Sequence, residues 1–136
     1  MGFIKSFFSG FVSTLIFHQG VLWILNLAGL INRAPFNLAP TPPFQIPAVI
    51  SLSFWGGIWG ILLWKILIGV RKPFTRFFTA LGFGALCPSL AALAVVLPLK
   101  GGAFMAGWNP KIILGALILN GTWGIGVALF LRILKA

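Results

Sequence analysis

The sequence predicts an all-α membrane protein with four transmembrane helices, and three observations support this prediction. Only 7% of the 136 residues are charged and 60% are hydrophobic, whereas about 25% of the residues of a soluble domain are charged. The mean hydropathy is +1.08. The apolar residues gather in four stretches, each long enough to cross about 30 Å of hydrocarbon as a helix. We expect residues 1–136 to form one transmembrane domain with helices over 7–31, 46–70, 77–99 and 112–134.

Local signals agree with these four helices and their connections. The first helix contains the only histidine, His18, near its midpoint. Five prolines in residues 32–47 predict an extended, semi-rigid connection to the second helix. Pro88 lies within the third helix, where a missing backbone hydrogen bond predicts a kink. The fourth helix follows Pro110, which suits a first helical turn because the amide that proline lacks has no partner there.

Basic residues predict the orientation of the helices. The chain has ten lysines and arginines and no aspartate or glutamate, so its formal net charge is +10. Both termini and the middle connection would share one side with seven basic residues: Lys5, Lys65, Arg71, Lys72, Arg76, Arg132 and Lys135. Only Arg33, Lys100 and Lys111 would lie on the other side. The positive-inside rule then places both termini in the cytoplasm, and the charge predicts contact with anionic lipids rather than nucleic acid.

Two pairs of similar segments indicate a duplicated helical hairpin. KSFFSGF at 5–11 is similar to TRFFTAL at 75–81, and GILLWKIL at 60–67 is similar to VALFLRIL at 127–134. The offsets, 70 and 67 residues, are about half the chain. Such a repeat would relate the two halves by an axis along the membrane normal. The alternative interpretation is chance similarity between leucine-rich helices.

Polar residues near the middle of the helices predict an intramembrane polar layer. Each helix carries hydrogen-bonding side chains at a similar depth, and an unpaired polar group in hydrocarbon is costly. We therefore expect these side chains to face one another inside the bundle, with Ser89 at the same depth on the third helix: His18, Gln19, Ser53, Asn120 and Thr122. Because the chain has no carboxylate side chain, the expected partners of His18 include Gln19, Asn120, a tryptophan, a ligand or another chain.

Small residues at four-residue spacing predict close helix contacts, because they let helix backbones approach one another in a membrane. The candidate packing positions are Gly56, Gly57, Gly60, Ala80, Gly84, Gly121 and Gly124. Three tryptophans, Trp55, Trp59 and Trp123, lie too deep for an interfacial belt. We expect each of these rings to fill a groove and each indole N–H to find an acceptor.

The missing residue types exclude several function classes. Without Asp or Glu there is no carboxylate general base, no carboxylate proton relay and no carboxylate cage for Mg²⁺ or Ca²⁺. The single cysteine, Cys87, forms no cysteine-based metal cluster, and no Walker A, G-x-S-x-G or H-E-x-x-H motif occurs. We therefore expect no enzyme activity, no metal and no cofactor. The alternative to the absence of a cofactor is a haem or a chlorophyll-type pigment, whose iron or magnesium His18 could ligate.

Three segments resemble a known kind of protein. GFVSTLIFHQG, APFNLAPTPP and IPAVISLSFWGGIWGILLW are similar to segments of a family of small, uncharacterised bacterial four-helix inner-membrane proteins. Phe17–Gly20, Ala39–Pro43 and Trp55–Trp59 carry the resemblance, which extends across most of the chain. It implies a four-helix fold in a bacterial inner (cytoplasmic) membrane, and it implies no particular activity.

Three functions fit these observations. The first is a non-catalytic accessory or assembly subunit that packs on a larger membrane complex, motivated by the lack of catalytic groups and the many small packing residues. The second is a homodimeric channel or carrier for a small anion or polar solute, motivated by the polar layer without negative charge. The third is a pigment- or haem-binding subunit that uses His18.

Overall fold

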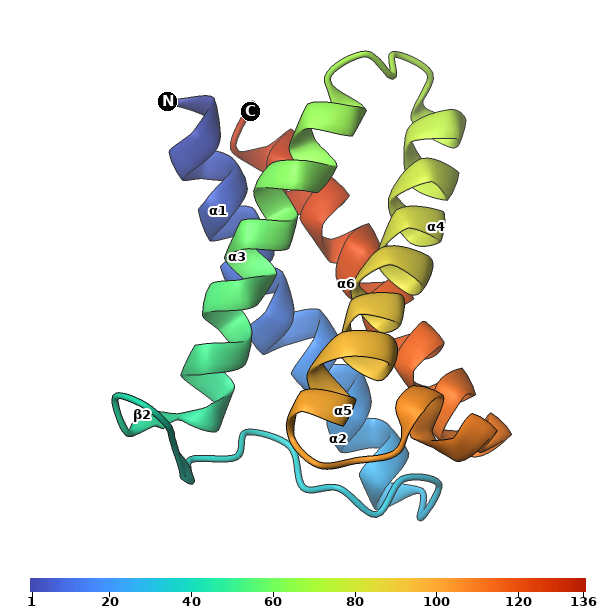
Figure 1. Ribbon diagram of the computed structural model, residues 1–136. Helices are drawn as coiled ribbons and strands as arrows, with labels where there is room; N and C mark the ends of the chain where they lie inside the picture. Colours follow the sequence, from blue (N-terminus) through green and yellow to red (C-terminus); the bar gives the residue numbers. More distant parts are fainter.

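The computed structural model describes residues 1–136 and is almost entirely helical (Figure 1). Four helices are long and apolar enough to cross a membrane: Gly2–Leu27, Ala48–Leu67, Pro73–Leu99 and Pro110–Ile133. The predicted all-α class and the predicted number of apolar helices are confirmed. The first helix begins five residues before its predicted start and ends at Leu27, shortly before Gly29, whose φ of 72° is typical of a helix end.

Two of the four helices contain a π-helical turn. The first helix consists of α1 (Gly2–Ser13), the π-turn η1 (Thr14–His18) and α2 (Gln19–Leu27). The third consists of α4 (Pro73–Ala91), the π-turn η2 (Ala92–Val96) and α5 (Leu97–Leu99). The other two, α3 (Ala48–Leu67) and α6 (Pro110–Ile133), are continuous. Pro88 lies inside α4, one turn before η2, so the irregular hydrogen bonding of this helix follows the proline.

The chain has two distinct ends. Both termini and the α3–α4 connection lie together at one end, which we call the terminal end (Figure 1). The connections 28–47 and 100–109 lie at the opposite end, the loop end. In the longer connection, β1 (Pro40–Thr41) pairs antiparallel with β2 (Ile46–Pro47). The shorter one contains the turn η3 (Phe104–Trp108), in which consecutive residues adopt left-handed backbone angles.

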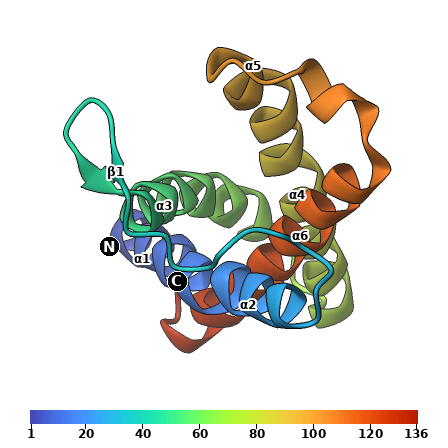
Figure 2. The same cartoon turned by 90° about the horizontal axis from the view of Figure 1, so that it is seen from below.

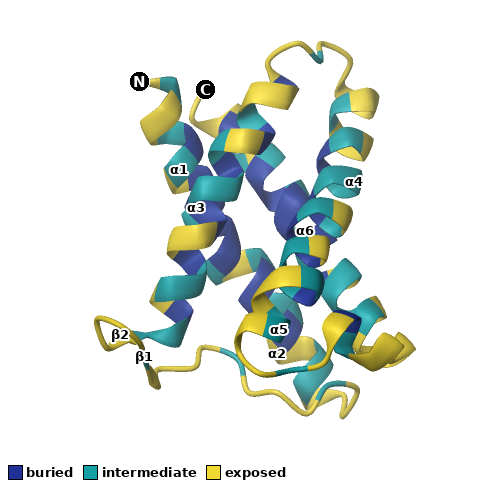
Figure 3. Ribbon diagram, viewed as in Figure 1, coloured by how far each residue is buried: buried dark blue, intermediate teal, exposed yellow.

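The four helices follow the spatial order α3, α1, α6, α4. The most extensive contacts join α1 to α3 and α4 to α6, and α1 and η1 also pack against α6. Buried residues follow these inner faces, whereas the outer faces are exposed (Figure 3). The largest apolar core lies towards the terminal end and comprises Leu63, Leu67, Ala80, Trp123, Val127 and Leu131.

The first hairpin, α1 with α3, is held by direct backbone contact between glycines. A Cβ atom added at Gly60 would lie 2.7 Å from the Ser6 carbonyl oxygen and 2.9 Å from Gly10 Cα. A Cβ atom added at Gly10 would contact the Gly56 carbonyl oxygen and lie 3.0 Å from Gly60 Cα. The two helices can approach this closely only because these positions have no side chain.

The second hairpin, α4 with α6, repeats this contact. A Cβ atom added at Gly84 would contact the Asn120 carbonyl oxygen and lie 2.9 Å from Gly124 Cα. Gly84 therefore takes the place that Gly10 has in the first hairpin, and Gly124 takes the place of Gly60. These contacts place the two hairpins in equivalent positions, with offsets of 74 residues (84 minus 10) and 64 residues (124 minus 60).

This register differs from the one that the sequence similarity suggested. The predicted offsets of 70 and 67 differ from the observed ones by four and three residues, which is about one helical turn, so they would pair residues on the same helix face but one turn apart in depth. A further contact supports the observed register: Gly57 faces the Phe7 ring, and the equivalent Gly121 faces Leu81. The two offsets differ by ten because the first loop-end connection (28–47) is ten residues longer than the second (100–109).

Candidate functional site

The residues of the predicted polar layer do not form one network. Among the five, hydrogen bonds link only His18 and Gln19, where Gln19 Nε2 donates to His18 Nδ1 at 3.1 Å. Asn120 donates to Ser89 Oγ, at the same depth on α4, at 3.0 Å, and Ser89 Oγ donates to the Ala116 carbonyl oxygen, so this pair is separate from His18 and Gln19. Equal depth along the helices therefore did not bring these side chains to one place.

Two other members of the predicted layer bond to their own helices. Ser53 Oγ donates to the Val49 carbonyl oxygen at 2.7 Å, and Thr122 Oγ1 donates to the carbonyl oxygens of Ile118 and Leu119 at 2.9 Å. Hydroxyl side chains often bond to the preceding turn in this way. Ser53 is fully buried, whereas Thr122 is half-buried.

His18 and Gln19 connect the first helix to the long loop-end connection. Both side chains are buried, with 7% and 3% of their surface exposed. Gln19 Oε1 accepts a hydrogen bond from the Phe36 N–H at 2.7 Å, while its amide donates to His18. His18 lies in η1, and Gln19 begins α2. The pair therefore attaches an otherwise exposed stretch of the connection to the helix bundle.

The central polar contact of the bundle involves residues outside the predicted layer. Ser13 Oγ donates to the Trp123 carbonyl oxygen at 2.7 Å, and Trp123 Nε1 donates to the Gly10 carbonyl oxygen at 3.1 Å. Gly126 lies against Ser13 and the Phe17 ring. We call this contact between α1–η1 and α6 the closed seam. The small residues Ser13 and Gly126 were its only signal in the sequence, because both acceptors are backbone atoms.

The opposite side of the molecule lacks such a contact. The first helices of both hairpins start at the terminal end, so a strict two-fold relation would pack α3 against α4 as α6 packs against α1. Instead α3 and α4 make few contacts with each other, and they diverge towards the loop end (Figure 2). We call the facing sides of α3 and α4 the open seam. Two side-chain contacts cross it: Arg76 Nη1 donates to the Leu67 carbonyl oxygen at 2.9 Å near the terminal end, and the rings of Trp59 and Phe83 lie 6.0 Å apart in an edge-to-face arrangement.

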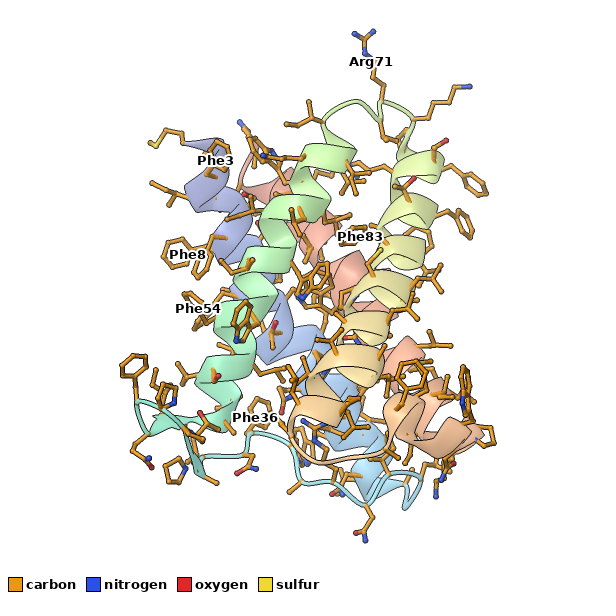
Figure 4. The ribbon with its side chains drawn as sticks, in the orientation of Figure 1. Phe3, Phe8, Phe36, Phe54, Arg71 and Phe83 are labelled. Atoms are coloured by element: carbon orange, nitrogen blue, oxygen red, sulfur yellow. The ribbon has the colours of Figure 1, made fainter.

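Side-chain size distinguishes the two seams. In the register of the repeated hairpins, Leu62 on α3 corresponds to Gly126 on α6. On the other helix of each seam, Phe83 corresponds to the fully buried Ser9, and Cys87 to Ser13. Small residues let α1 and α6 meet, whereas the larger side chains keep α3 and α4 apart (Figure 4 places Phe83 on the side of α4 that faces α3).

The three predicted deep tryptophans have different environments. Trp123 is buried, with 3% of its surface exposed, and its indole has an acceptor, as expected. Trp59 is half-buried beside Phe83. The expectation for Trp55 was wrong: 58% of its surface is exposed. Its equivalent in the closed seam is Leu119, which is only 6% exposed, whereas the Trp55 ring contacts the ring of Phe54 on its own helix at 5.9 Å.

The predicted packing residues all lie at helix contacts. Gly56 and Gly60 face α1, Gly57 faces Phe7, and Gly121 faces Leu81. Across α4 and α6, a Cβ atom added at Gly124 would contact the Ala80 carbonyl oxygen, and Ala80 is fully buried. No three histidine, cysteine or acidic side chains come together as metal ligands. The site therefore consists of two comparable helix seams, one occupied and one open.

The chain thus belongs to the class of all-helical bundles with four apolar helices long enough to cross a membrane. Comparison with known proteins adds no closer relationship. No protein-family model matches the sequence, and neither a curated protein nor a solved structure shows significant similarity to it.

Proposed function

We propose that the chain is a non-catalytic integral membrane protein that serves as an accessory or assembly subunit, and that its open seam receives a helix of another membrane subunit. The observation that carries this proposal is the contrast between the two seams. Leu119 and Trp123 on α6 are buried, and Trp123 bonds to α1, whereas the equivalent Trp55 and the neighbouring Leu62 on α3 remain 58% and 44% exposed. A helix with small residues on one face would fill the open seam as α1 fills the closed one.

The internal hydrogen bonds support a packing role over a conduction role. The polar side chains of the bundle interior bond to backbone carbonyls or to each other, and Trp64 Nε1 is the one buried side-chain polar atom without a partner. A solute pathway needs polar groups that are free to contact the solute. The homodimeric channel or carrier and the His18-dependent haem or pigment subunit are the two alternative functions. Crosslinking and absorption spectroscopy distinguish them from the accessory subunit.

We propose that the protein resides in a bacterial inner membrane with both termini in the cytoplasm. The apolar length of the four helices supports insertion into a bilayer. The terminal end carries seven of the ten basic residues, and the positive-inside rule associates this excess with the cytoplasm. The bacterial assignment rests on the resemblance of Phe17–Gly20 and Trp55–Trp59 to segments of bacterial four-helix proteins. A reporter fused to Ala136 tests the orientation.

Site-specific photocrosslinking in native membranes tests the open seam. A photoreactive amino acid at Leu62 should form an adduct with one defined membrane protein. The same amino acid at Phe8 is the matched control, because this residue is similarly exposed, 55% against 44%, and points away from the seam (Figure 4). The captured protein should also co-purify at constant stoichiometry in mild detergent, and Leu62→Gln should reduce that recovery.

Each other outcome counts against the proposal. Adducts with lipid alone, or equal adducts from Leu62 and Phe8, would contradict a partner helix in the open seam. An adduct with a second copy of the chain would favour the homodimeric alternative. A Soret or Qy absorption band in the gently purified protein, lost in His18→Ala, would favour the haem or pigment alternative.

A further inference from the structure

A cleft at the terminal end combines an apolar lining with basic side chains. It has a volume of about 600 Å³ and lies between the first turns of α4 and the last turns of α6. Phe77, Ile125 and Leu129 contribute apolar surface, and four basic residues contribute charge: Arg71, Arg76, Arg132 and Lys135. It is separate from the closed seam, and it adjoins the open seam only at Arg76.

The two kinds of surface are separated along the helix axis. Ile125 and Arg132 are seven residues apart on α6, which corresponds to about 10 Å. The lining is apolar at Ile125 and Leu129 and becomes basic at Arg132, next to the terminal end. A phospholipid has the same division, with acyl chains on one side of a phosphate. A soluble phosphate compound would use only the basic part.

The basic side chains have no carboxylate side chain to neutralise them, because the chain contains no Asp or Glu. Arg76 is half-buried, and its Nη1 donates to the Leu67 carbonyl oxygen at 2.9 Å. This bond fixes the guanidinium and leaves most of its five N–H donors for an anion. Arg71 extends away from the bundle at the rim (Figure 4). The first turn of α4, which begins at Pro73, adds the positive end of a helix dipole.

We propose that this cleft is a specific site for an anionic phospholipid. The lipid phosphate lies among Arg76, Arg132 and Lys135, and an acyl chain lies against Phe77 and Leu129. The inference rests on the proposed membrane location, but it does not depend on the proposed partner helix.

Native mass spectrometry of the full chain in detergent tests the site. Phosphatidylglycerol and phosphatidylcholine with identical acyl chains are titrated separately, with inorganic phosphate as a third probe. Phosphatidylglycerol should bind at least about 10-fold more tightly than phosphatidylcholine. Because each basic residue near a lipid surface contributes about a fivefold effect, the double variant Arg132→Gln/Lys135→Gln should bind phosphatidylglycerol about 30-fold more weakly. Both side chains are exposed, so the variant should keep its fold, which thermal unfolding verifies.

The matched control removes the same charge at the loop end. Lys100→Gln/Lys111→Gln should leave the affinity for phosphatidylglycerol unchanged, and Arg132→Lys should stay within about threefold of the original chain. Equal affinity for the two lipids, or an equal loss in the control, would overturn the site. Inorganic phosphate that binds as tightly as phosphatidylglycerol would overturn the lipid assignment. A chain that stays folded and dispersed without detergent would instead refute the membrane location.

Discussion

The closed and open seams lie between the same two hairpins, yet only the closed one is filled by the chain itself. On the closed side, Ser13 and Gly126 leave room for the Trp123 ring and for two hydrogen bonds across the contact. On the open side, the equivalent residues Cys87 and Leu62 are larger, and the equivalent ring, Trp59, contacts Phe83 and the edge of the apolar core without a hydrogen bond across the seam. One repeated architecture therefore gives two different outcomes through a few changes in side-chain volume.

The comparison illustrates how helices associate in a bilayer. Lipid tails are as apolar as leucine, so apolar surface alone does not bring two membrane helices together. Close backbone approach and interhelical hydrogen bonds remain as the stabilising contributions. The closed seam has both, whereas the open seam has no glycine contact between its helices. It has one hydrogen bond at the terminal end, from Arg76 to the Leu67 carbonyl oxygen, and one edge-to-face contact between aromatic rings, worth about 0.5–1.5 kcal/mol. An apolar but bulky helix face is thus available to a partner that supplies the small residues.

Disrupting the glycine contact that both hairpins share should have the largest effect on stability. Gly60→Leu and the equivalent Gly124→Leu would each force a side chain into the backbone of the facing helix, and we expect each to destabilise the fold by about 4 kcal/mol or more. Thermal unfolding in detergent measures the loss. Gly20→Leu is the control, because no atom lies within 4 Å of an added Cβ there. A similar loss in the control would refute the equivalence of the two glycine contacts.

Making the closed seam resemble the open one should have the next largest effect. Gly126→Leu gives α6 the residue type that α3 has at the equivalent Leu62. An added Cβ at Gly126 would already lie 2.7 Å from Phe17 Cγ. We expect destabilisation by about 2–3 kcal/mol and greater labelling of a probe cysteine on α1. Gly82→Leu, with open space around it, should change neither quantity. Unchanged stability of Gly126→Leu would mean that side-chain volume does not separate the seams.

The equivalent tryptophans should differ in sensitivity to the loss of the indole N–H. Trp123→Phe removes the hydrogen bond to the Gly10 carbonyl oxygen and should cost about 1–2 kcal/mol. Trp59→Phe removes no hydrogen bond and keeps most of the ring contact with Phe83, so its effect should stay below about 0.5 kcal/mol. Reversible unfolding in mixed micelles gives both values. Equal values for the two variants would contradict the assigned asymmetry.

The smallest difference is expected at the equivalent positions Ser13 and Cys87. Ser13→Ala removes the hydrogen bond to the Trp123 carbonyl oxygen, and bonds of this kind in membrane proteins contribute about 0.6 kcal/mol. Cys87 is a free, half-buried thiol, and Cys87→Ala should change stability by less than that. Combining Ser13→Ala with Trp123→Phe tests coupling, because both side chains act in one contact. Strict additivity of the two losses would show that the bonds act independently.

Much of the fold was predictable from apolar length. Four apolar helices and their short connections follow from runs of hydrophobic residues separated by prolines, glycines and basic residues. The start of the first helix was placed too late because Lys5 was treated as a boundary. A lysine within the first turns of a membrane helix can extend its long side chain towards the polar region, and Lys5 Nζ lies 3.5 Å from the Lys135 carbonyl oxygen.

The site was less predictable, because sequence position gives depth along a helix but not the rotation of that helix. His18, Ser53 and Asn120 lie at similar depth, yet they bond in three different places. Hydrogen bonds to backbone acceptors leave no pattern of matching residue types, so the pair formed by Ser13 and Trp123 was missed. The glycine contacts were predictable because a missing side chain is itself visible in a sequence.

The π-helical turn η1 gives the first span one place where it can tolerate a change in chain length. Each residue of a helix advances it by about 100° of rotation and 1.5 Å of length, and a π-turn accommodates one extra residue without disturbing the segments on either side. Deleting one residue between Thr14 and Phe17 would therefore convert the π-turn to α-helix and leave both α1 and α2 in place, so Gln19 would keep its hydrogen bond to Phe36. The two parts of the span therefore have different constraints. The rotation of α1 is fixed by its glycine contacts with α3, and the rotation of α2 is fixed by the bond of Gln19 to the loop-end connection.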